Sequence, residues 1–314
     1  MTKPVILLAA DLPPVTVAEL EGLFTVLDLP ADTAAAQDFL HRYGAQVKGM
    51  ALRGTVVDQA MLDALPELEV IASYSAGLDN VDVAAVRARG IALKNSSHIL
   101  AADVANTAIA LLLAVTKDLV GADAFVRQGR WQAQVQFPLT RSVVGMKVGL
   151  VGLGAIGTET AARLQSLGAE ISYTGPNRKP VDLPYHATTP ELAAASEALI
   201  LTCPLTAKTR HSVDSAVLSA LGPKGYLVNI SRGPVVDEAA LLDALAAGTI
   251  AGAALDVFEF EPRVPQALID NPKVVLTPHI GSGTVETRQA MADHVVDALA
   301  RHLGVTSPDR RRPG

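Results

Sequence analysis

Short apolar runs alternate with segments of helical spacing along almost the whole chain, and this alternation limits the possible folds more than any other feature. Apolar runs of four to six residues predict buried strands, and the segments between them predict helices. Strands that alternate with helices form parallel sheets with helices on both faces. In the first hundred residues we expect strands at Val5–Ala10, Val47–Leu52, Val70–Ser73 and Ile91–Lys94, and helices at Val15–Leu23, Thr33–Tyr43, Gln59–Leu65 and Val83–Arg89.

A long helix, expected at Ala101–Leu119, leads to a second region of the same kind that opens with the strand Lys147–Val151. Thr189 is the expected N-cap of one of its helices, and a last helix is expected at Val285–Leu303. We therefore expect two α/β domains that divide near residue 100, with the last helix returning to the first domain. The further strands of the second region are expected at Ile171–Thr174, Ala198–Cys203, Tyr226–Ile230, Ala251–Leu255 and Val274–Thr277.

Composition narrows the class of protein. The 314 residues correspond to about two domains at ~150 residues each, and 49% hydrophobic residues exclude a disordered chain. The formal charge of 26 minus 32, or −6, gives no sign of a nucleic-acid partner. Cys203 is the only cysteine, which excludes an internal disulfide and a cysteine-based zinc cluster, so no metal is expected. The longest apolar run, Ala108–Val115, is far shorter than the ~20 residues that span a bilayer, and we expect a cytoplasmic protein without a membrane partner.

A glycine motif follows the strand Lys147–Val151. Gly152, Gly154 and Gly157 form G-x-G-x-x-G between a predicted strand and a predicted helix. In that setting the first glycine permits a tight turn, the second lets a pyrophosphate approach the backbone, and the third lets the helix pack on the strand. The helix N-terminus at Ala155 and Ile156 offers N–H groups to the phosphates. The motif predicts a dinucleotide site; a glycine-rich turn without a ligand is the alternative.

The residues after the second strand of this region indicate which dinucleotide. An acidic residue is expected there when the ribose carries a free 2′-hydroxyl, but none lies between Glu170 and Asp182. The loop contains Asn177, Arg178 and Lys179 instead, and an arginine can bind a 2′-phosphate through two hydrogen bonds. We therefore expect NADPH in preference to NADH, which would bind more weakly. The alternative is that these side chains only solvate a loop.

Three polar residues follow three consecutive predicted strands. Arg232, Glu261 and His279 come at or soon after the carboxyl ends of these strands, and ligands of doubly wound sheets bind at that edge. Reduction of a carbonyl by hydride needs an acid for the developing alkoxide and a cation to hold it. A histidine fixed by a carboxylate, beside an arginine, meets both needs. Taken singly, each residue could equally have a structural role.

At this point the chain resembles the D-2-hydroxyacid dehydrogenase family over nearly its whole length. Within that family it looks most like the NADPH-dependent glyoxylate/hydroxypyruvate reductases, including relatives that act on arylpyruvates or keto-sugar acids. Several motifs in the family's order and spacing are much more specific than the glycine motif alone. The matching stretches are Ser73–Asp79, Gly152–Gly157, Asn229–Glu238, Ala254–Pro262 and Pro278–Ser282.

The resemblance implies a role for each matching residue. His279 gives its proton to the substrate carbonyl oxygen, Glu261 hydrogen-bonds the other ring nitrogen, and Arg232 binds the 2-oxo acid. Arg53 either reaches the substrate from the first domain or is a solvated loop residue. The other substrate-binding residues implied are Ala76, Gly77 and Ser282. The residues implied to border the cofactor, besides the motif and loop described above, are Cys203, Pro204, Thr209, Ile230, Asp256 and Gly281, with Cys203 as a wall and not a nucleophile.

The resemblance also implies an architecture and a reaction. A Rossmann cofactor domain, residues 99–284, is inserted into a flavodoxin-like substrate domain formed by residues 1–98 and 285–314. The implied reaction is NADPH-dependent reduction of a small 2-oxo acid to the D-2-hydroxy acid, in a homodimer. The alternatives are an arylpyruvate or 2-keto sugar acid as substrate, oxidation of phosphite on the same fold, or a non-catalytic protein that senses NAD(P). Trp131 is either part of the wall of the substrate pocket, together with residues 132–138, or a plain packing residue.

Overall fold

The computed structural model describes residues 2–306. The chain forms two compact units, each described by itself: unit 1 consists of residues 1–100 and 285–314, and unit 2 of residues 101–284. The first division falls inside helix α5 (Ser97–Thr116), two residues after the boundary expected from the sequence. The last helix, α12 (Val285–His302), belongs to unit 1.

Unit 1 contains a five-stranded parallel sheet in the order β2-β1-β3-β4-β5. This is the order of flavodoxin-like sheets, in which ligands bind where the strand order reverses, here between β1 and β3. The expected flavodoxin-like architecture is therefore confirmed. The strands are β1 (Val5–Ala9), β2 (Thr25–Asp28), β3 (Val47–Leu52), β4 (Val70–Ser73) and β5 (Ala92–Lys94).

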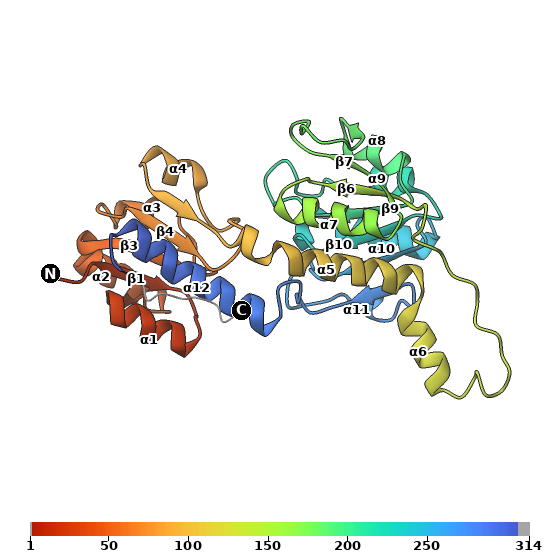
Figure 1. Ribbon diagram of the computed structural model, residues 1–314, viewed down its shortest axis with the longest axis horizontal. Helices are drawn as coiled ribbons and strands as arrows, with labels where there is room; N and C mark the ends of the chain where they lie inside the picture. The colour runs from red at the N-terminus through yellow and green to blue at the C-terminus, as the bar shows by residue number, and fades with distance from the viewer. Residues whose placement is uncertain (1, 307–314) are drawn as a thin grey trace. The chain divides into compact units, whose positions relative to one another are not determined.

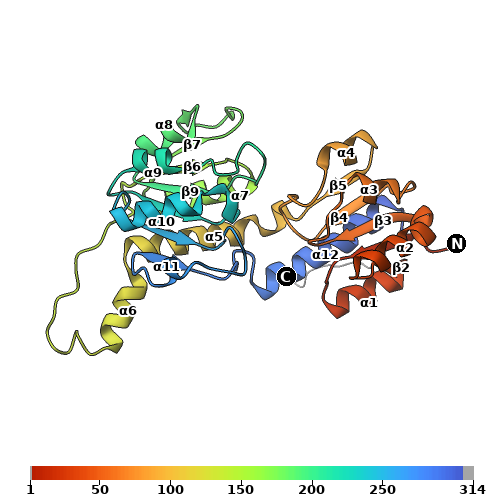
Figure 2. The same cartoon turned by 180° about the vertical axis from the view of Figure 1, so that it is seen from behind.

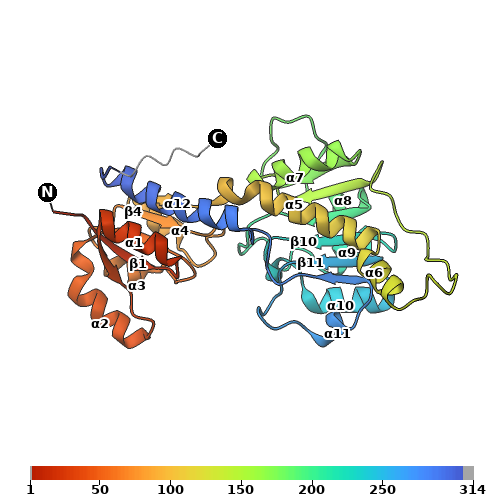
Figure 3. The ribbon, with the colours of Figure 1, turned by 60° about the horizontal axis from the view of Figure 1, so that its bottom comes forward.

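Helices cover both faces of the unit 1 sheet. On one face, α12 packs on β3 and β4 and lies beside α1 (Pro14–Leu23), as Figure 3 shows. A side chain at Gly49 in β3 would come within 3.0 Å of Leu299 Cδ2 in α12, so the glycine permits this close packing. Buried residues of α2 (Thr33–Tyr43), α3 (Gln59–Asp63) and α4 (Val83–Ala88) form the core on the other face.

Unit 2 contains a seven-stranded parallel sheet in the order β12-β11-β10-β9-β6-β7-β8. Numbered from β6 as the first strand, its first six strands have the 3-2-1-4-5-6 order of dinucleotide-binding sheets, and the order reverses between β6 and β9. The expected Rossmann architecture is confirmed. The strands are β6 (Lys147–Val151), β7 (Glu170–Thr174), β8 (Tyr185–His186), β9 (Ala198–Leu201), β10 (Tyr226–Asn229), β11 (Gly252–Leu255) and β12 (Val274–Leu276).

The unit 2 sheet also has helices on both faces. In Figure 1, α5 and α7 (Ala155–Ser166) lie in front of the sheet. Figure 2 shows the opposite face, which α9 (Ser215–Leu221) and α10 (Glu238–Ala247) cover. Leucines and valines of α9 and α10 join α8 (Thr189–Ala194) and α11 (Gln266–Ile269) in one core. A 3-10 turn, η2 (Gly233–Val235), follows β10.

Helix α5 begins four residues before the helix expected from the sequence and ends three residues before the expected end. It spans 20 residues, its most apolar 18-residue window has a mean hydropathy of 1.9, and it is the one helix among residues 2–306 long and apolar enough to cross a membrane. Core helices of soluble proteins meet the same criterion, and 44% of its most apolar window is buried inside the structure. Its buried residues include Val104, Ala108, Leu111 and Val115, spaced three or four apart. That spacing gives the helix one inward-facing side.

A second helix, α6 (Leu119–Arg127), follows α5 and was not expected. Figure 1 shows it and the segment after it running out from the rest of unit 2. We call residues 118–140 the arm. Its rings pack on one another, with Phe125 and Phe137 centroids 5.3 Å apart, and Trp131 is 70% exposed. The arm also exposes Leu119, Val120, Val126, Val135 and Leu139.

Most expected strands agree with the structure to within two residues, and two were missed. Both missed strands, β2 and β8, are short and lie at the edges of their sheets. One expected helix cap was wrong by one position: the side chain of Thr188, not Thr189, accepts a hydrogen bond from the Glu191 N–H, because Thr189 is already in the first helical turn.

Candidate functional site

The glycine turn lies at the point where the order of the unit 2 strands reverses. Gly152 has φ of +104°, and a Cβ there would lie 2.9 Å from Cys203 Cα, so the ends of β6 and β9 meet without room for a side chain. A Cβ at Gly157 would collide with the Gly152 carbonyl. At Gly154, in contrast, a Cβ would have no atom within 4 Å. Packing thus requires a glycine at positions 152 and 157, whereas the space beside Gly154 is open.

The open space at Gly154 fits a pyrophosphate. Gly154 is the N-cap of α7, and no side chain caps this helix, so the N–H groups of its first turn face that space. A helix N-terminus with free N–H groups is suited to bind phosphate. Ala155 and Ile156 are the first residues of α7, as expected. The residues present therefore fit a dinucleotide.

The end of β9 forms one wall of this region. Cys203 is buried, and burial raises the pKa of its thiol to about 11. A thiol that stays protonated at neutral pH is a poor nucleophile, which agrees with its expected role as a wall. Its carbonyl accepts a hydrogen bond of 2.7 Å from Ser231 Oγ, just after β10. Thr209 Oγ1 donates to the Pro204 carbonyl at 2.7 Å and so fixes the turn after Cys203.

The loop after β7 is exposed. Asn177, Arg178 and Lys179 are all exposed to solvent. The loop itself is held at its base, because the Lys179 N–H donates to Tyr173 Oη at 2.7 Å and Tyr185 Oη donates to the Gly175 carbonyl at 3.0 Å. The backbone is therefore fixed while the basic side chains stand in solvent, next to the position where the second strand of a dinucleotide fold meets the ribose.

His279 and Glu261 form the pair that the sequence predicts. His279 Nδ1 lies 2.9 Å from Glu261 Oε2, and Glu261 Oε1 accepts a hydrogen bond of 3.0 Å from the Phe258 N–H. A carboxylate has no proton to donate, so Nδ1 carries the proton and Nε2 is left to exchange one. The His279 side chain is 48% exposed, which keeps Nε2 accessible.

Asp256 holds the backbone on which His279 stands. It is 1% exposed, and its carboxylate accepts hydrogen bonds from the N–H groups of Ile280 at 2.8 Å and Gly281 at 2.9 Å and from Thr277 Oγ1 at 2.6 Å. Its carbonyl accepts the His279 N–H at 2.9 Å. His279 has φ of +53°, a conformation uncommon for residues other than glycine. These bonds stabilise that conformation. Asp256 was expected to border the cofactor, but its carboxylate oxygens accept hydrogen bonds from the chain itself.

Arg232 lies directly before η2. Its Nη1 donates to the Ser231 carbonyl at 2.8 Å, and its own carbonyl accepts a hydrogen bond of 3.0 Å from Asn229 Nδ2. A Cβ at the next residue, Gly233, would collide with the Phe258 carbonyl. The backbone that carries Arg232 therefore touches the loop that carries Glu261. Ile230, in the same segment, is 6% exposed.

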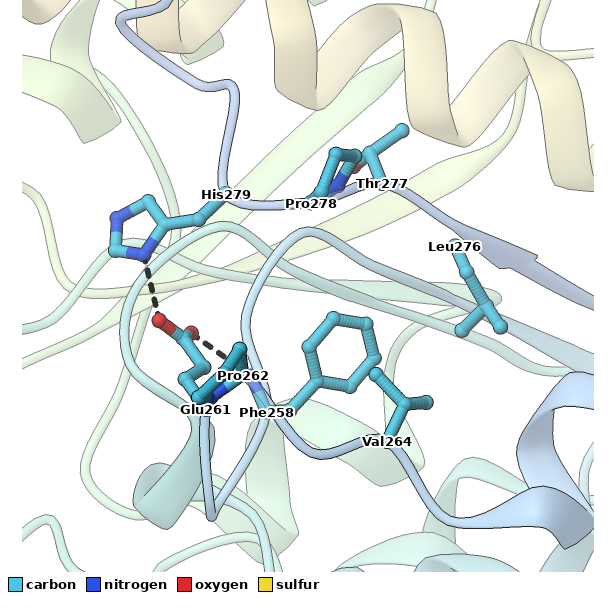
Figure 4. Close-up of a pocket in the computed structure, with 8 residues that line it drawn as sticks. All are labelled: Phe258, Glu261, Pro262, Val264, Leu276, Thr277, Pro278 and His279. Carbon is cyan, nitrogen blue, oxygen red and sulfur yellow. Dashed lines mark hydrogen bonds and ion pairs between the residues drawn. The ribbon is translucent and has the colours of Figure 1, made fainter.

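A mainly apolar cavity of about 270 Å³ adjoins the His279–Glu261 pair. Figure 4 shows its side chains on one side of His279 and the ring nitrogen that is not bonded to Glu261 turned to the other side. His279 Nε2 therefore faces away from the other side chains that line this cavity. Its other lining residues are Phe258, Pro262, Val264, Leu276, Thr277 and Pro278.

The residues expected to bind substrate divide between the two units. In unit 1, Arg53 follows β3 at the point where the strand order reverses; it donates to the Asp11 carbonyl at 3.0 Å and stacks on the Tyr74 ring at 5.2 Å. Ala76 and Gly77 follow β4, and the Ala76 carbonyl accepts a hydrogen bond of 2.8 Å from Asn95 Nδ2. Ser282, half-buried, belongs to unit 2.

The structure contains a second histidine–carboxylate pair that was not expected from the sequence. His211 Nε2 lies 2.8 Å from Glu259 Oε1. Glu259 could have been suspected, because it stands in the same strand-end loop as Glu261. His211 follows no motif used above, and only its position after β9, in a turn that also contains Thr209, could have pointed to it.

Comparisons with known proteins agree with this geometry. Residues 109–281 match the family model of the D-isomer specific 2-hydroxyacid dehydrogenase NAD binding domain. Glyoxylate/hydroxypyruvate reductase A of Arabidopsis thaliana is 48% identical over 78% of this chain and 79% of its own. Hydroxyphenylpyruvate reductase of Plectranthus scutellarioides is 43% identical over 86% of each chain. Among solved structures, an NADPH-dependent glyoxylate/hydroxypyruvate reductase from Sinorhizobium meliloti, in complex with NADP and malonate, has a TM-score of 0.86 and 41% identity over 100% of both chains.

Proposed function

The chain belongs to the D-isomer specific 2-hydroxyacid dehydrogenases, and from that premise we propose that it reduces a small 2-oxo acid to the D-2-hydroxy acid with NADPH. The substrate carbonyl carbon gains a hydride and its oxygen gains a proton. When bound, the reduced dinucleotide supplies the hydride. The chain's own residues supply the proton, hold the substrate and hold the dinucleotide.

The hydrogen bond between His279 Nδ1 and Glu261 carries this proposal. It fixes the ring so that Nε2 faces away from Glu261 and can give a proton to the substrate oxygen. When both ring nitrogens are protonated, the nearby carboxylate stabilises the positive charge. Asp256 keeps the ring in place through its bonds to the Thr277 hydroxyl and to the N–H groups of His279 and Ile280.

Arg232 is the proposed anchor for the substrate. A 2-oxo acid carries a carboxylate next to its carbonyl, and a guanidinium can bind both oxygens with parallel N–H groups. Its positive charge stabilises the negative charge that develops on the carbonyl oxygen. The proposed substrate contacts of unit 1, through Arg53 and the N–H groups of Ala76 and Gly77, follow from the family resemblance.

The preference for NADPH is supported by the loop after β7. Arg178 and Lys179 provide positive charge next to the expected ribose position, and no acid stands between Glu170 and Asp182 to repel a 2′-phosphate. The solved relative from Sinorhizobium meliloti was obtained with NADP. NADH remains a weaker alternative cofactor in this proposal.

Glyoxylate or hydroxypyruvate is the proposed substrate, because the relatives with these names match the chain over most of its length. An arylpyruvate is the second candidate, favoured by the relative that reduces hydroxyphenylpyruvate. A 2-keto sugar acid shares the same 2-oxo acid group and belongs in the same test.

We further propose a homodimer in the cytoplasm. The arm exposes six large apolar side chains within 21 residues of sequence, and exposed apolar surface that is larger than single scattered side chains commonly marks an interface. A second copy of the chain is the proposed partner that covers it. The single cysteine, which is buried and cannot form an internal disulfide, supports a reducing compartment.

The test is a set of initial rates at 340 nm with glyoxylate, hydroxypyruvate, hydroxyphenylpyruvate and 2-ketogluconate, each with NADPH and with NADH. We expect NADPH oxidation with at least one substrate, and a product of D configuration by chiral chromatography. His279→Asn should lower kcat by about 10²–10⁴-fold, while His302→Asn, an exposed histidine of α12, serves as the matched control.

Two results would count against the proposal. No rate with any substrate and either cofactor, combined with measurable NADPH binding, would favour a protein that only senses the dinucleotide. A normal kcat in His279→Asn would show that another group donates the proton.

A further inference from the structure

A second histidine–carboxylate pair lies outside the reaction described above. His211 Nε2 and Glu259 Oε1 are 2.8 Å apart, and the Glu259 side chain is only 14% exposed. A fully exposed ion pair of this kind contributes little to stability. This pair differs because one partner is largely buried and because each residue also contacts a further segment near the candidate site.

The backbone of His211 joins two segments that border the site. It follows the turn that Thr206 and Thr209 close, where the Thr206 N–H donates to Thr209 Oγ1 at 2.7 Å. His211 itself has φ of +51°, and its N–H donates to the Pro234 carbonyl at 2.8 Å. Pro234 belongs to η2, immediately after Arg232. The histidine thus links the turn after β9 to the turn that follows the proposed substrate anchor.

Glu259 is fixed on its other side by Glu238, the first residue of α10. The Glu259 N–H donates to Glu238 Oε2 at 3.3 Å, and burial raises the pKa of the Glu238 carboxyl above its ordinary value. The preceding residue, Phe258, donates its N–H to Glu261 Oε1 at 3.0 Å. Glu259 is therefore adjacent in sequence to the residue whose N–H group holds the carboxylate of the His279–Glu261 pair.

We propose that His211 is a positioning residue for the reaction: by holding Glu259, it keeps Glu261 at hydrogen-bond distance from His279. This inference rests on the proposed function. It also predicts communication within unit 2, because the turn that contains Thr209 is the one expected to border the cofactor. When a bound cofactor fixes that turn, His211 is fixed with it, and through Glu259 so is the loop Phe258–Glu261. That loop holds the Glu261 carboxylate against His279, the proposed proton donor.

Two substitutions at His211 separate its side chain from its backbone. His211→Asn suits the left-handed backbone, because asparagine adopts it more readily than most residues, but its amide is one bond too short to reach Glu259. His211→Gln places its amide nitrogen as many bonds from Cα as Nε2 and keeps the donor. We expect His211→Asn to lower kcat about tenfold with KM for the 2-oxo acid within about twofold, since a shift of about 1 Å in supporting groups can cost up to about 10²-fold. His211→Gln should recover most of the loss.

A double-mutant cycle tests whether the two residues act as one unit. If they do, His211→Asn combined with Glu259→Ala lowers kcat no further than either substitution alone. Equal melting temperatures of His211→Asn and His211→Gln, together with unequal kcat, distinguish positioning from a loss of stability. His41→Asn, an exposed histidine of α2, is the control for removal of a histidine far from the site.

A measurement without cofactor or substrate keeps the inference separate from the proposed function. The chain has seven histidines, so ¹⁵N-histidine labelling gives an imidazole spectrum that single substitutions can assign. The Nδ1 proton of His279, bonded to Glu261, should exchange slowly in the wild type and in His211→Gln, and at least about tenfold faster in His211→Asn when that bond breaks.

The outcomes are distinct. An unchanged His279 signal in His211→Asn overturns the positioning role, whatever the activity. A changed signal in a protein that reduces no 2-oxo acid supports the link from His211 to His279 and overturns the proposed function instead. If His211→Asn does not fold, the same comparison is made between Glu259→Ala and Glu259→Gln, where Gln keeps an acceptor for His211; equal exchange rates in these two variants would overturn the inference.

Discussion

Individual carboxylates in unit 2 act mainly on other residues rather than on a ligand. Glu261 determines which nitrogen of His279 carries the proton, and Asp256 holds the backbone around that histidine. Both are acidic residues near strand ends; the family resemblance assigns Glu261 to the histidine, as the structure has it, but it assigns Asp256 to the border of the cofactor and not to the backbone around His279. The distinction comes from burial: Asp256 is 1% exposed and its oxygens are used by N–H and hydroxyl groups of the chain, whereas His279 and Glu261 remain partly exposed.

Arg178 should select between the two dinucleotides. Hydrogen bonds to charged groups contribute about 1.5–3 kcal/mol, so Arg178→Ala is expected to raise the Kd of NADPH about tenfold or more and to leave the Kd of NADH nearly unchanged. Quenching of intrinsic fluorescence or isothermal titration measures both constants. Arg87→Ala, an exposed arginine of α4, should change neither. Equal losses for the two cofactors would contradict the assignment of a 2′-phosphate site.

His294 in α12 should make stability depend on pH. Burial lowers the pKa of His294 below its ordinary value of 6.5, opposed by the Asn95 backbone and Asp297 and assisted by Arg301 and Lys94, and Nε2 is buried without a partner among the described residues. As pH falls through about 6.5, the unfolded chain takes up a proton that the folded chain binds only at lower pH, so the folded state loses stability. The melting temperature should fall less in His294→Gln than in the wild type between about pH 7.5 and 5.5.

The matched control for that measurement is His302→Gln, at the exposed end of the same helix. It should follow the wild-type curve. Parallel curves for all three proteins would show that His294 takes up its proton equally in the folded and unfolded states.

The places of the candidate catalytic side chains could be predicted because each side chain follows a strand and stands in a recognisable stretch of sequence. The His211–Glu259 pair could not, because its two residues are 48 positions apart and meet only through the fold. The same reason hid the contact between Gly233 and Phe258, which brings the segments of Arg232 and Glu261 together. Local patterns predict which residues stand at the sheet edge, and only packing decides which of them touch.

At the scale of elements, two glycines of the turn from β6 to α7 should have different roles: Gly154 in binding the cofactor and Gly157 in the stability of the fold. Gly154→Ala adds a methyl group where there is no neighbour within 4 Å, so the melting temperature should stay within about 1 °C while NADPH affinity falls about tenfold, or about 1.4 kcal/mol. Gly157→Ala forces a collision with the Gly152 carbonyl and should lower the free energy of unfolding by about 1–3 kcal/mol. Thermal unfolding and NADPH titration of both variants check this; two equally destabilised variants would refute it.

The elements not expected from the sequence have weak local patterns, for a different reason in each. In β2, two apolar residues lie between polar ends, and the strand pairs on one side only, so it lacks the apolar run of a central strand. The N-cap of helix α6 is Asp118, whose φ is +47° and whose carboxylate accepts the Gly121 N–H at 3.2 Å. A glycine so near the start of a helix weakens the helical pattern. Central strands were predicted well because burial on both faces requires continuous apolar residues.

At the scale of the whole molecule, the arm predicts a defined oligomer. Light scattering after gel filtration should give about twice the chain mass of 32.7 kDa. A double substitution, Val126→Asp with Leu139→Asp, should return the mass to that of one chain, because both apolar side chains are exposed on the arm. Val56→Asp, an exposed valine of unit 1, is the control. A single-chain mass for the wild type would contradict the proposed dimer.

The return of α12 to unit 1 has a consequence for how the chain is made. The ribosome synthesises the chain from its N-terminus, so all segments of unit 2 emerge before α12, the helix that completes unit 1. Until then, one face of the earlier sheet lacks the side chains of Met291, Val295, Val296 and Leu299, all nearly fully buried in the finished protein. Nascent unit 1 therefore keeps apolar surface exposed until α12 has been synthesised, whereas unit 2, which is inserted into it, can fold earlier. During synthesis, the part of the chain that begins first is the last to be finished.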